Sequence, residues 1–151
     1  MGQQQLLLVI LVTILVGIAT VVAINVFGSA ATEANRDAVR QDILQGVASA
    51  QALYAKPILL DGAGGTFATF DNNNAMLRRL NMPVVLGGGT CTEAVYGNEN
   101  GCYAVSGRGA DGFTLTGTPA SGTDAIVAAV TVTEVTDTDG TRNEWTIAWD
   151  E

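Results

Sequence analysis

The feature that most constrains this chain is an uncharged apolar run of membrane length near its N-terminus. Between Leu6 and Ile24 no residue is charged, and only Thr13, Gly17 and Thr20 interrupt the apolar side chains. A helix needs roughly 20 predominantly apolar residues to cross the ~30 Å hydrocarbon core of a bilayer. A helix that is apolar on every side is buried, either in lipid or in a packed protein core.

The charges around this run do not fit a signal peptide or an ordinary anchor. A signal peptide has a basic region ahead of an apolar stretch of about 7 to 15 residues, whereas the first basic residue here is Arg36. Arg36 and Arg40 alone would hold the C-terminal side in the cytoplasm. The two cysteines on that side suit an oxidising outside compartment better. We therefore expect that a short basic leader has been removed, which makes Met1 the processed N-terminus.

The helical pattern continues beyond the apolar run and becomes amphipathic. Pro57 supplies a stop signal, so one helix of about 55 residues, about 80 Å long, is predicted. Apolar residues recur in its second half at spacings of three and four, as on one stripe of a helix, at Val39, Ile43, Val47, Ala50 and Tyr54.

The remainder of the chain predicts a small β-rich domain. Residues 58–90 are rich in Gly and Asn around a short helical or turn-like "AMLRRL", and we interpret them as a long surface connection. "GCYAVSG" and "GFTLTGT" alternate as strands do. A longer hairpin follows, with Asp139-Gly140 as its type I′ turn, which would place Val130 opposite Trp149.

These patterns predict an α+β fold in which a long N-terminal helix packs on a small antiparallel sheet. The first half of the helix is apolar on every side and the second half is amphipathic. We divide the chain into an apolar helix over residues 1–28, an amphipathic helix over residues 29–56 and a β-rich globular head over residues 57–151.

Residues that carry chemistry are sparse. The chain has no His, which removes the usual general base and the commonest metal ligand. No spacing pairs a nucleophile with a base, so we expect neither an enzyme nor a cofactor. The net charge of −8 disfavours nucleic-acid binding. Asp137 and Asp139 could share a calcium ion, but they lack the full spacing of a calcium loop, and a hairpin turn explains them equally well.

Two further patterns leave alternatives open. Cys91 and Cys102 enclose a turn-like segment, and in an oxidising compartment we predict a disulfide between them. Such a short loop would contribute about 2 to 3 kcal/mol; the alternative is two buried free thiols. The segment from Thr116 to Thr123 is interpreted as a plain surface loop, with O-glycosylation as the alternative.

The apolar helix without a basic flank, its amphipathic extension, the Gly-rich connection, the β-strands and the late cysteine pair together make the chain resemble a mature type IV pilin. The specific resemblance is confined to about the first 56 residues. It implies an inner-membrane precursor, cut by a prepilin peptidase and methylated at the new N-terminus. The assembly machinery would then extract subunits into a homopolymeric, extracellular helical filament on the cell surface.

In such a filament the N-terminal helices form the core, and we place Gln5, Leu11, Leu15 and Gly17 at the subunit contacts. Bacterial pilins usually carry Glu at position 5, so Gln5 would accept a weaker hydrogen bond from a neighbour's amino terminus. They also often carry Pro near position 22, where this chain has Val22.

Three alternatives remain open at this stage. "GQQQ" is similar to archaeal pilin precursors, which are cut just before a Gln; on this alternative the chain would be an archaeal-type adhesion pilin with Met1-Gly2 as leader remnant, whereas the bacterial type is preferred. A pseudopilin of a type II secretion system and a membrane-anchored binding module that never polymerises are the other two.

Overall fold

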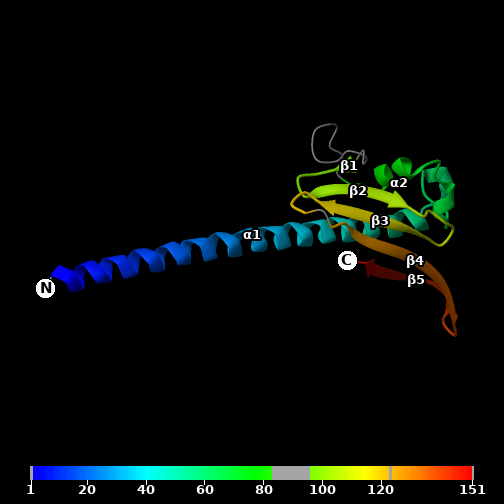
Figure 1. Cartoon of the computed structure of the whole chain (residues 1–151). Helices are drawn as coiled ribbons and strands as arrows, with labels where there is room; N and C mark the ends of the chain where they lie inside the picture. Colours follow the sequence, from blue (N-terminus) through cyan, green and yellow to red (C-terminus); the bar gives the residue numbers. More distant parts are fainter. Residues whose placement is uncertain (1, 83–95, 123, 151) are drawn as a thin grey trace. The chain divides into compact units, whose positions relative to one another are not determined.

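A computed structural model describes residues 2–82, 96–122 and 124–150 of the chain. It contains helix α1 (Gly2–Ala55), 3₁₀ turns η1 (Ile58–Leu60) and η2 (Phe67–Thr69), helix α2 (Asn73–Arg79), and strands β1 (Tyr96–Gly97), β2 (Gly101–Ser106), β3 (Gly112–Pro119), β4 (Ile126–Asp137) and β5 (Gly140–Asp150) (Figure 1). The strands form one antiparallel sheet in the order β1-β2-β3-β4-β5. The predicted α+β fold is therefore confirmed.

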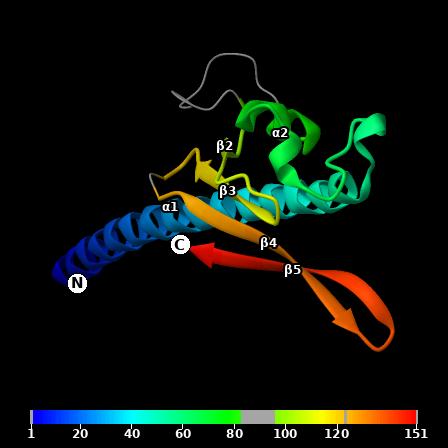
Figure 2. The same ribbon diagram turned by 90° about the vertical axis from the view of Figure 1, so that its right-hand side faces the viewer.

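The chain divides into two compact units, Met1–Ala34 and Asn35–Glu151. In the first unit the described chain is entirely helical, as the N-terminal part of α1. The second unit contains the remainder of α1 and the sheet, which lie side by side in both views (Figure 2). The amphipathic part of the helix thus belongs structurally to the globular domain.

The second half of α1 buries the apolar stripe that its sequence pattern predicts. Val39, Ile43, Val47 and Ala50 are at most 2% exposed, and Tyr54 packs at the edge of the core. The helix ends at Ala55, because Pro57 lacks the N–H that a further helical hydrogen bond would need.

The sheet covers this stripe with the inward-facing residues of its strands. Leu115 of β3 and Ile126 of β4 are fully buried, and Val130 is nearly so. A Cβ at Gly117 of β3 would lie 2.6 Å from Val39 Cγ1 and 3.0 Å from the Cδ1 atom of Ile43. Glycine is therefore required at Gly117 for the helix and the sheet to approach this closely.

The β4–β5 hairpin forms as predicted, but the predicted register is wrong by two residues. Val130 lies opposite Ile147, and Asp137 lies opposite Gly140. The turn is made by Thr138 and Asp139, which have no positive φ, while Gly140 has a φ of 120°. The predicted type I′ turn, which needs a positive φ at both central residues, is therefore replaced by a turn without positive φ at those residues, followed by a glycine with positive φ. A shift of two residues keeps every side chain on its predicted face.

Residues 58–82 are not the surface connection that we expected, because they complete the core. Phe67 of η2 is fully buried, and its ring lies 5.2 Å from Tyr54, 4.9 Å from Phe113 and 6.1 Å from Trp145, measured between ring centroids. "AMLRRL" is helical up to Arg79, with Leu80 as its C-cap, and the other buried hydrophobic residues of the segment are Ala63, Met76, Leu77, Leu80 and Met82.

Candidate assembly segment

The candidate functional site is the exposed apolar part of α1, residues 6–27, which we call the apolar segment. Its large apolar side chains are all exposed, from 47% at Ile10 to 74% at Phe27. An 18-residue window of α1 has a mean hydropathy of 3.1, and none of that window is buried. By length and composition this helix can cross a membrane.

The few polar groups in and after the apolar segment are satisfied within the helix itself. The Thr13 hydroxyl donates a hydrogen bond to the carbonyl oxygen of Ile10, and the Thr20 hydroxyl donates to that of Val16, both at 2.8 Å. Ser29 makes the same kind of bond to the Val26 carbonyl, at 3.0 Å. The segment can therefore enter lipid or a protein core without leaving a hydroxyl unpaired.

All four residues that we predicted at subunit contacts lie on α1. Gln5 is exposed, and Leu11 and Leu15 are 64% and 65% exposed. Because they are four residues apart, Leu11 and Leu15 share one face of the helix. No heavy atom lies within 4 Å of a Cβ placed on Gly17, which leaves room for the close approach of another helix.

The other sequence-predicted sites fall at or beyond the limits of the described residues. Met1 and Cys91 lie outside them, so the processed N-terminus and the disulfide stay predictions. Cys102 lies on β2 and is partly buried. Strand β3 runs to Pro119, so the first part of the segment that we interpreted as a loop from Thr116 is strand.

A polar cluster that the sequence did not reveal fastens α1 to the β1–β2 turn. The Asp42 carboxylate oxygen Oδ2 accepts hydrogen bonds from Tyr103 Oη at 2.5 Å, Asn98 Nδ2 at 2.7 Å and Asn100 Nδ2 at 2.9 Å. Asn98 Oδ1 also accepts from the backbone N–H of Asn100 and of Gly101. We call Asp42, Asn98, Asn100 and Tyr103 the polar clamp.

The electrostatics of the polar clamp keep Asp42 charged and Tyr103 neutral. Burial alone would raise the pKa of the Asp42 carboxyl, but the hydrogen bonds from Asn100, Tyr103 and Asn98 together lower that pKa below 3.8. Burial, followed by the hydrogen bond to Asp42 and its negative charge, raises the pKa of Tyr103. Neither shift creates a general base near neutral pH, so the clamp acts as a structural tether.

Asn35 adds a second attachment between α1 and the sheet, about two helical turns before Asp42. Its Nδ2 donates to the carbonyl oxygen of Asn100 at 2.9 Å, and its Oδ1 accepts from the Ser121 hydroxyl at 2.8 Å. The helix is thus fixed to the chain on both sides of one end of the β2–β3 pair, where Gly101 lies opposite Pro119. Among these residues the sequence shows only the Asn-rich "YGNENG", which predicts a turn and no partner.

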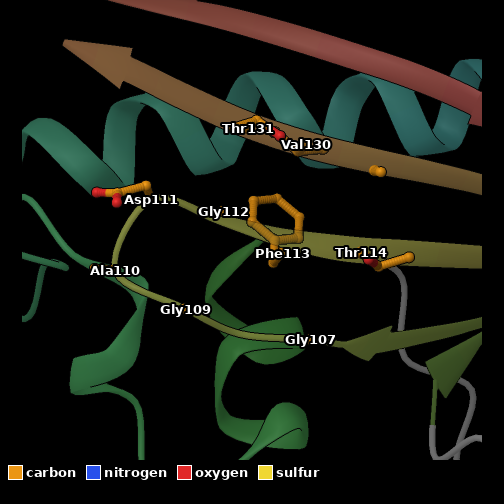
Figure 3. Close-up of a pocket in the computed structure, with 10 residues that line it drawn as sticks. Gly107, Gly109, Ala110, Asp111, Gly112, Phe113, Thr114, Val130 and Thr131 are labelled. Atoms are coloured by element: carbon orange, nitrogen blue, oxygen red, sulfur yellow. The ribbon is translucent and has the colours of Figure 1, made fainter.

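An open pocket of about 390 Å³ lies where the Gly-rich loop after β2 meets β3 and β4 (Figure 3). Asp111 is the only titratable residue among those that line it, next to Phe113, Thr114 and Thr131. Acid–base catalysis needs groups in complementary protonation states, which this lining does not supply.

The hairpin tip was the candidate calcium site. The Asp137 Oδ1 atom accepts hydrogen bonds from the backbone N–H and the hydroxyl of Thr138, at 2.7 and 3.3 Å. Over the part of the chain that the structure describes, no three His, Cys, Asp or Glu side chains are grouped so that they could hold a metal ion.

Comparison with known proteins does not assign this chain to a family. No family model matches the chain, and no curated protein or solved structure matches it. Its functional interpretation therefore depends on the exposed apolar segment and on the domain that follows it.

Proposed function

We propose that this chain is the structural subunit of an extracellular, type IV pilus-like helical filament, assembled through the apolar segment. The observation that supports the proposal is the exposure of every large apolar side chain from Leu6 to Phe27. Burial of apolar surface contributes about 25 cal/mol per Å², or roughly 1.5 to 3 kcal/mol for each large side chain. Such a surface requires lipid or other protein around it.

The domain at residues 35–151 has a closed core of its own. That core includes Val39 and Ile43 from α1, Phe67 from η2 and Leu115 from β3, all fully buried. Packing within the domain therefore does not depend on the apolar segment, which is available for other contacts. Lipid would cover the segment in the unassembled precursor, and copies of the same segment would cover it in the filament.

The apolar segment contains few polar residues, which suits both the lipid around the precursor and the packed helices of a filament. Helices in lipid associate through close packing at small residues, and Gly17 and the Thr residues supply such positions. Over a dozen large side chains per subunit would then be buried between helices. The free energy gained from this burial would exceed the entropy cost of association by a wide margin. The assembly machinery and a prepilin peptidase are the partners that this proposal implies.

Shearing of intact cells followed by electron microscopy of the released material tests the proposal. We expect thin filaments in the sheared fraction, and this chain as their main protein by mass spectrometry. A chain that stays with the membranes and is a monomer in detergent would instead be a membrane-anchored module, and the filament proposal would be wrong.

A further inference from the structure

The polar clamp contains a chemically labile pair of residues. Asn100 and Gly101 form the one Asn-Gly pair in the sequence. In such a pair the backbone nitrogen of the glycine can attack the side-chain carbonyl carbon of the asparagine, because glycine has no side chain to hinder the approach and its backbone rotates freely. The side-chain amide is then lost as ammonia. Asn100 is therefore the asparagine whose sequence context most favours deamidation.

The fold requires both members of this pair. A Cβ at Gly101 would overlap the backbone carbonyl oxygen of Thr118 on β3, so even alanine would force β2 and β3 apart at this point. Asn100 Nδ2 donates to Asp42 Oδ2 at 2.9 Å, and this bond needs a donor at position 100. The labile pair is thus imposed by the structure, and its lifetime depends on how firmly it is held.

The attacking group and the leaving group of the reaction are both hydrogen-bonded in the folded chain. The attacking nitrogen belongs to Gly101, and its N–H donates to Asn98 Oδ1 at 3.1 Å. The leaving group is Nδ2 of Asn100, which Asp42 holds. Attack on the side chain of Asn100 would break both bonds, so the polar clamp opposes the reaction at its first step.

The peptide bond between Asn100 and Gly101 is also fixed. Its carbonyl oxygen accepts hydrogen bonds from the backbone N–H of Ala120 at 2.8 Å and from Asn35 Nδ2 at 2.9 Å. The backbone of Asn100 would have to rotate before a five-membered ring could close, and that rotation would move the carbonyl oxygen away from both donors. Deamidation therefore requires that the β1–β2 turn first leaves α1.

We propose that Asn100 is a modification site that the polar clamp keeps in its amide form, and that deamidation follows local opening of the clamp. In the opened turn the Gly101 nitrogen bonds to Cγ of Asn100 as the Cγ–Nδ2 bond breaks, and ammonia leaves with the proton of that nitrogen. Water then opens the cyclic imide at either carbonyl carbon and gives aspartate or isoaspartate. This inference is independent of the proposed filament, because it concerns contacts within the domain.

The product cannot restore the polar clamp. The reaction replaces the amide donor that contacts Asp42 by a carboxylate, which has no proton to donate when it is ionised. Two carboxylates that share a site also repel each other. Isoaspartate lengthens the backbone by a methylene group as well, and so displaces the carbonyl oxygen that Ala120 and Asn35 hold. An opening that is otherwise reversible thereby becomes permanent.

Deamidation kinetics of the full-length chain in detergent test the proposal. The chain is incubated at mildly alkaline pH and digested at acid pH to prevent further reaction, and mass spectrometry quantifies aspartate and isoaspartate at position 100. We expect the folded wild-type chain to react at least about tenfold more slowly than the same chain unfolded in urea, because only the opened fraction reacts. Equal rates in the two states would overturn the proposal.

Three variants separate opening of the clamp from unfolding of the whole domain. Asp42→Ala releases the leaving amide and Asn98→Ala releases the attacking N–H, so each should accelerate deamidation several-fold in the folded chain. Phe67→Ala is the control, because it removes a fully buried ring outside the clamp, and it should accelerate the reaction less. No acceleration in Asp42→Ala, or a reaction at least as fast in Phe67→Ala, would overturn the protective role of the clamp.

An independent readout concerns the product. Asn100→Asp should shift the midpoint of urea unfolding to a lower concentration than in the wild-type chain. Asp42→Asn in the same chain should restore part of this shift, because it again places a donor opposite a carboxylate. A wild-type midpoint for Asn100→Asp would overturn the claim that the product cannot restore the clamp, and a double variant without recovery would overturn its explanation by like charges.

Discussion

At the scale of single residues, Asp42 has the clearest structural role in the described chain. Its carboxylate gathers three side-chain donors, each at least 56 positions away in the sequence. No local pattern could have identified these partners, since a half-buried Asp on an amphipathic helix looks like any other polar-face residue. The pairing exists only because the β1–β2 turn lies over the helix.

Removal of the Asp42 carboxylate should therefore destabilise the domain. We expect Asp42→Ala to lower the free energy of unfolding by about 2 to 3 kcal/mol, because the buried Tyr103 hydroxyl loses a charged acceptor. Asp37→Ala is the matched control on the same helix, and its exposed pair with Arg40 at 3.0 Å is worth less than about 0.5 kcal/mol. Urea unfolding followed by Trp fluorescence measures both, and equal effects would contradict the assigned role.

The same carboxylate predicts a pH dependence with a definite sign. The pKa of Asp42 is lower in the folded chain than its ordinary value of 3.8, so the charged form stabilises the fold above that value. The stabilisation is lost as the pH falls through the lowered pKa. We expect the wild-type chain to lose stability more steeply than Asp42→Asn between about pH 4 and pH 2; parallel curves for the two chains would refute this.

At the scale of elements, the sequence predicts the helices and strands well and their packing poorly. The end of α1 follows from Pro57, and its buried face follows from the spacing of Val39, Ile43 and Val47. The hairpin register was missed because Gly140 was assigned to the turn, whereas it takes the paired position after it. Residues 58–82 were missed because their buried side chains follow neither helical nor strand periodicity across two 3₁₀ turns.

The contact between α1 and β3 predicts the effect of one added methyl group. Gly117→Ala would place its Cβ 2.6 Å from Val39 Cγ1, so side chains in the core must move. We expect a loss of about 1 to 3 kcal/mol in the free energy of unfolding. Gly122→Ala is the control, since no heavy atom lies within 4 Å of its added Cβ; a neutral Gly117→Ala would show that the helix and sheet pack more loosely.

The aromatic cluster predicts that η2 is essential to the domain. Phe67→Ala removes a fully buried ring and should cost about 3 to 5 kcal/mol. Leu59→Ala in the preceding turn is the control, because a side chain that is 98% exposed should change stability by less than about 0.5 kcal/mol. Thermal unfolding followed by near-UV circular dichroism compares them, and a mild effect of Phe67→Ala would argue that residues 58–82 contribute little to the core.

At the scale of the whole molecule, the chain combines a domain that buries its own core with an apolar segment, residues 6–27, whose large side chains are all exposed. The sequence predicts both parts, since an uncharged run at Leu6 to Ile24 and a striped helix after it are visible in the residues alone. It does not predict the polar clamp, because the clamp depends on contacts between segments that are distant in the sequence. Assembly through the apolar segment follows from its exposure together with the closed core of the domain.

The most direct test of this account places a charge in the apolar segment. Leu11→Asp and Leu15→Asp should abolish filaments in electron micrographs of sheared material, because an unpaired carboxylate is too costly to bury between helices. The domain should keep its wild-type unfolding transition, and Gln45→Asp, at an exposed polar position of the same helix, should leave filaments intact. Filaments of wild-type diameter and yield from Leu11→Asp or Leu15→Asp would contradict the claim that the apolar segment holds the subunits together.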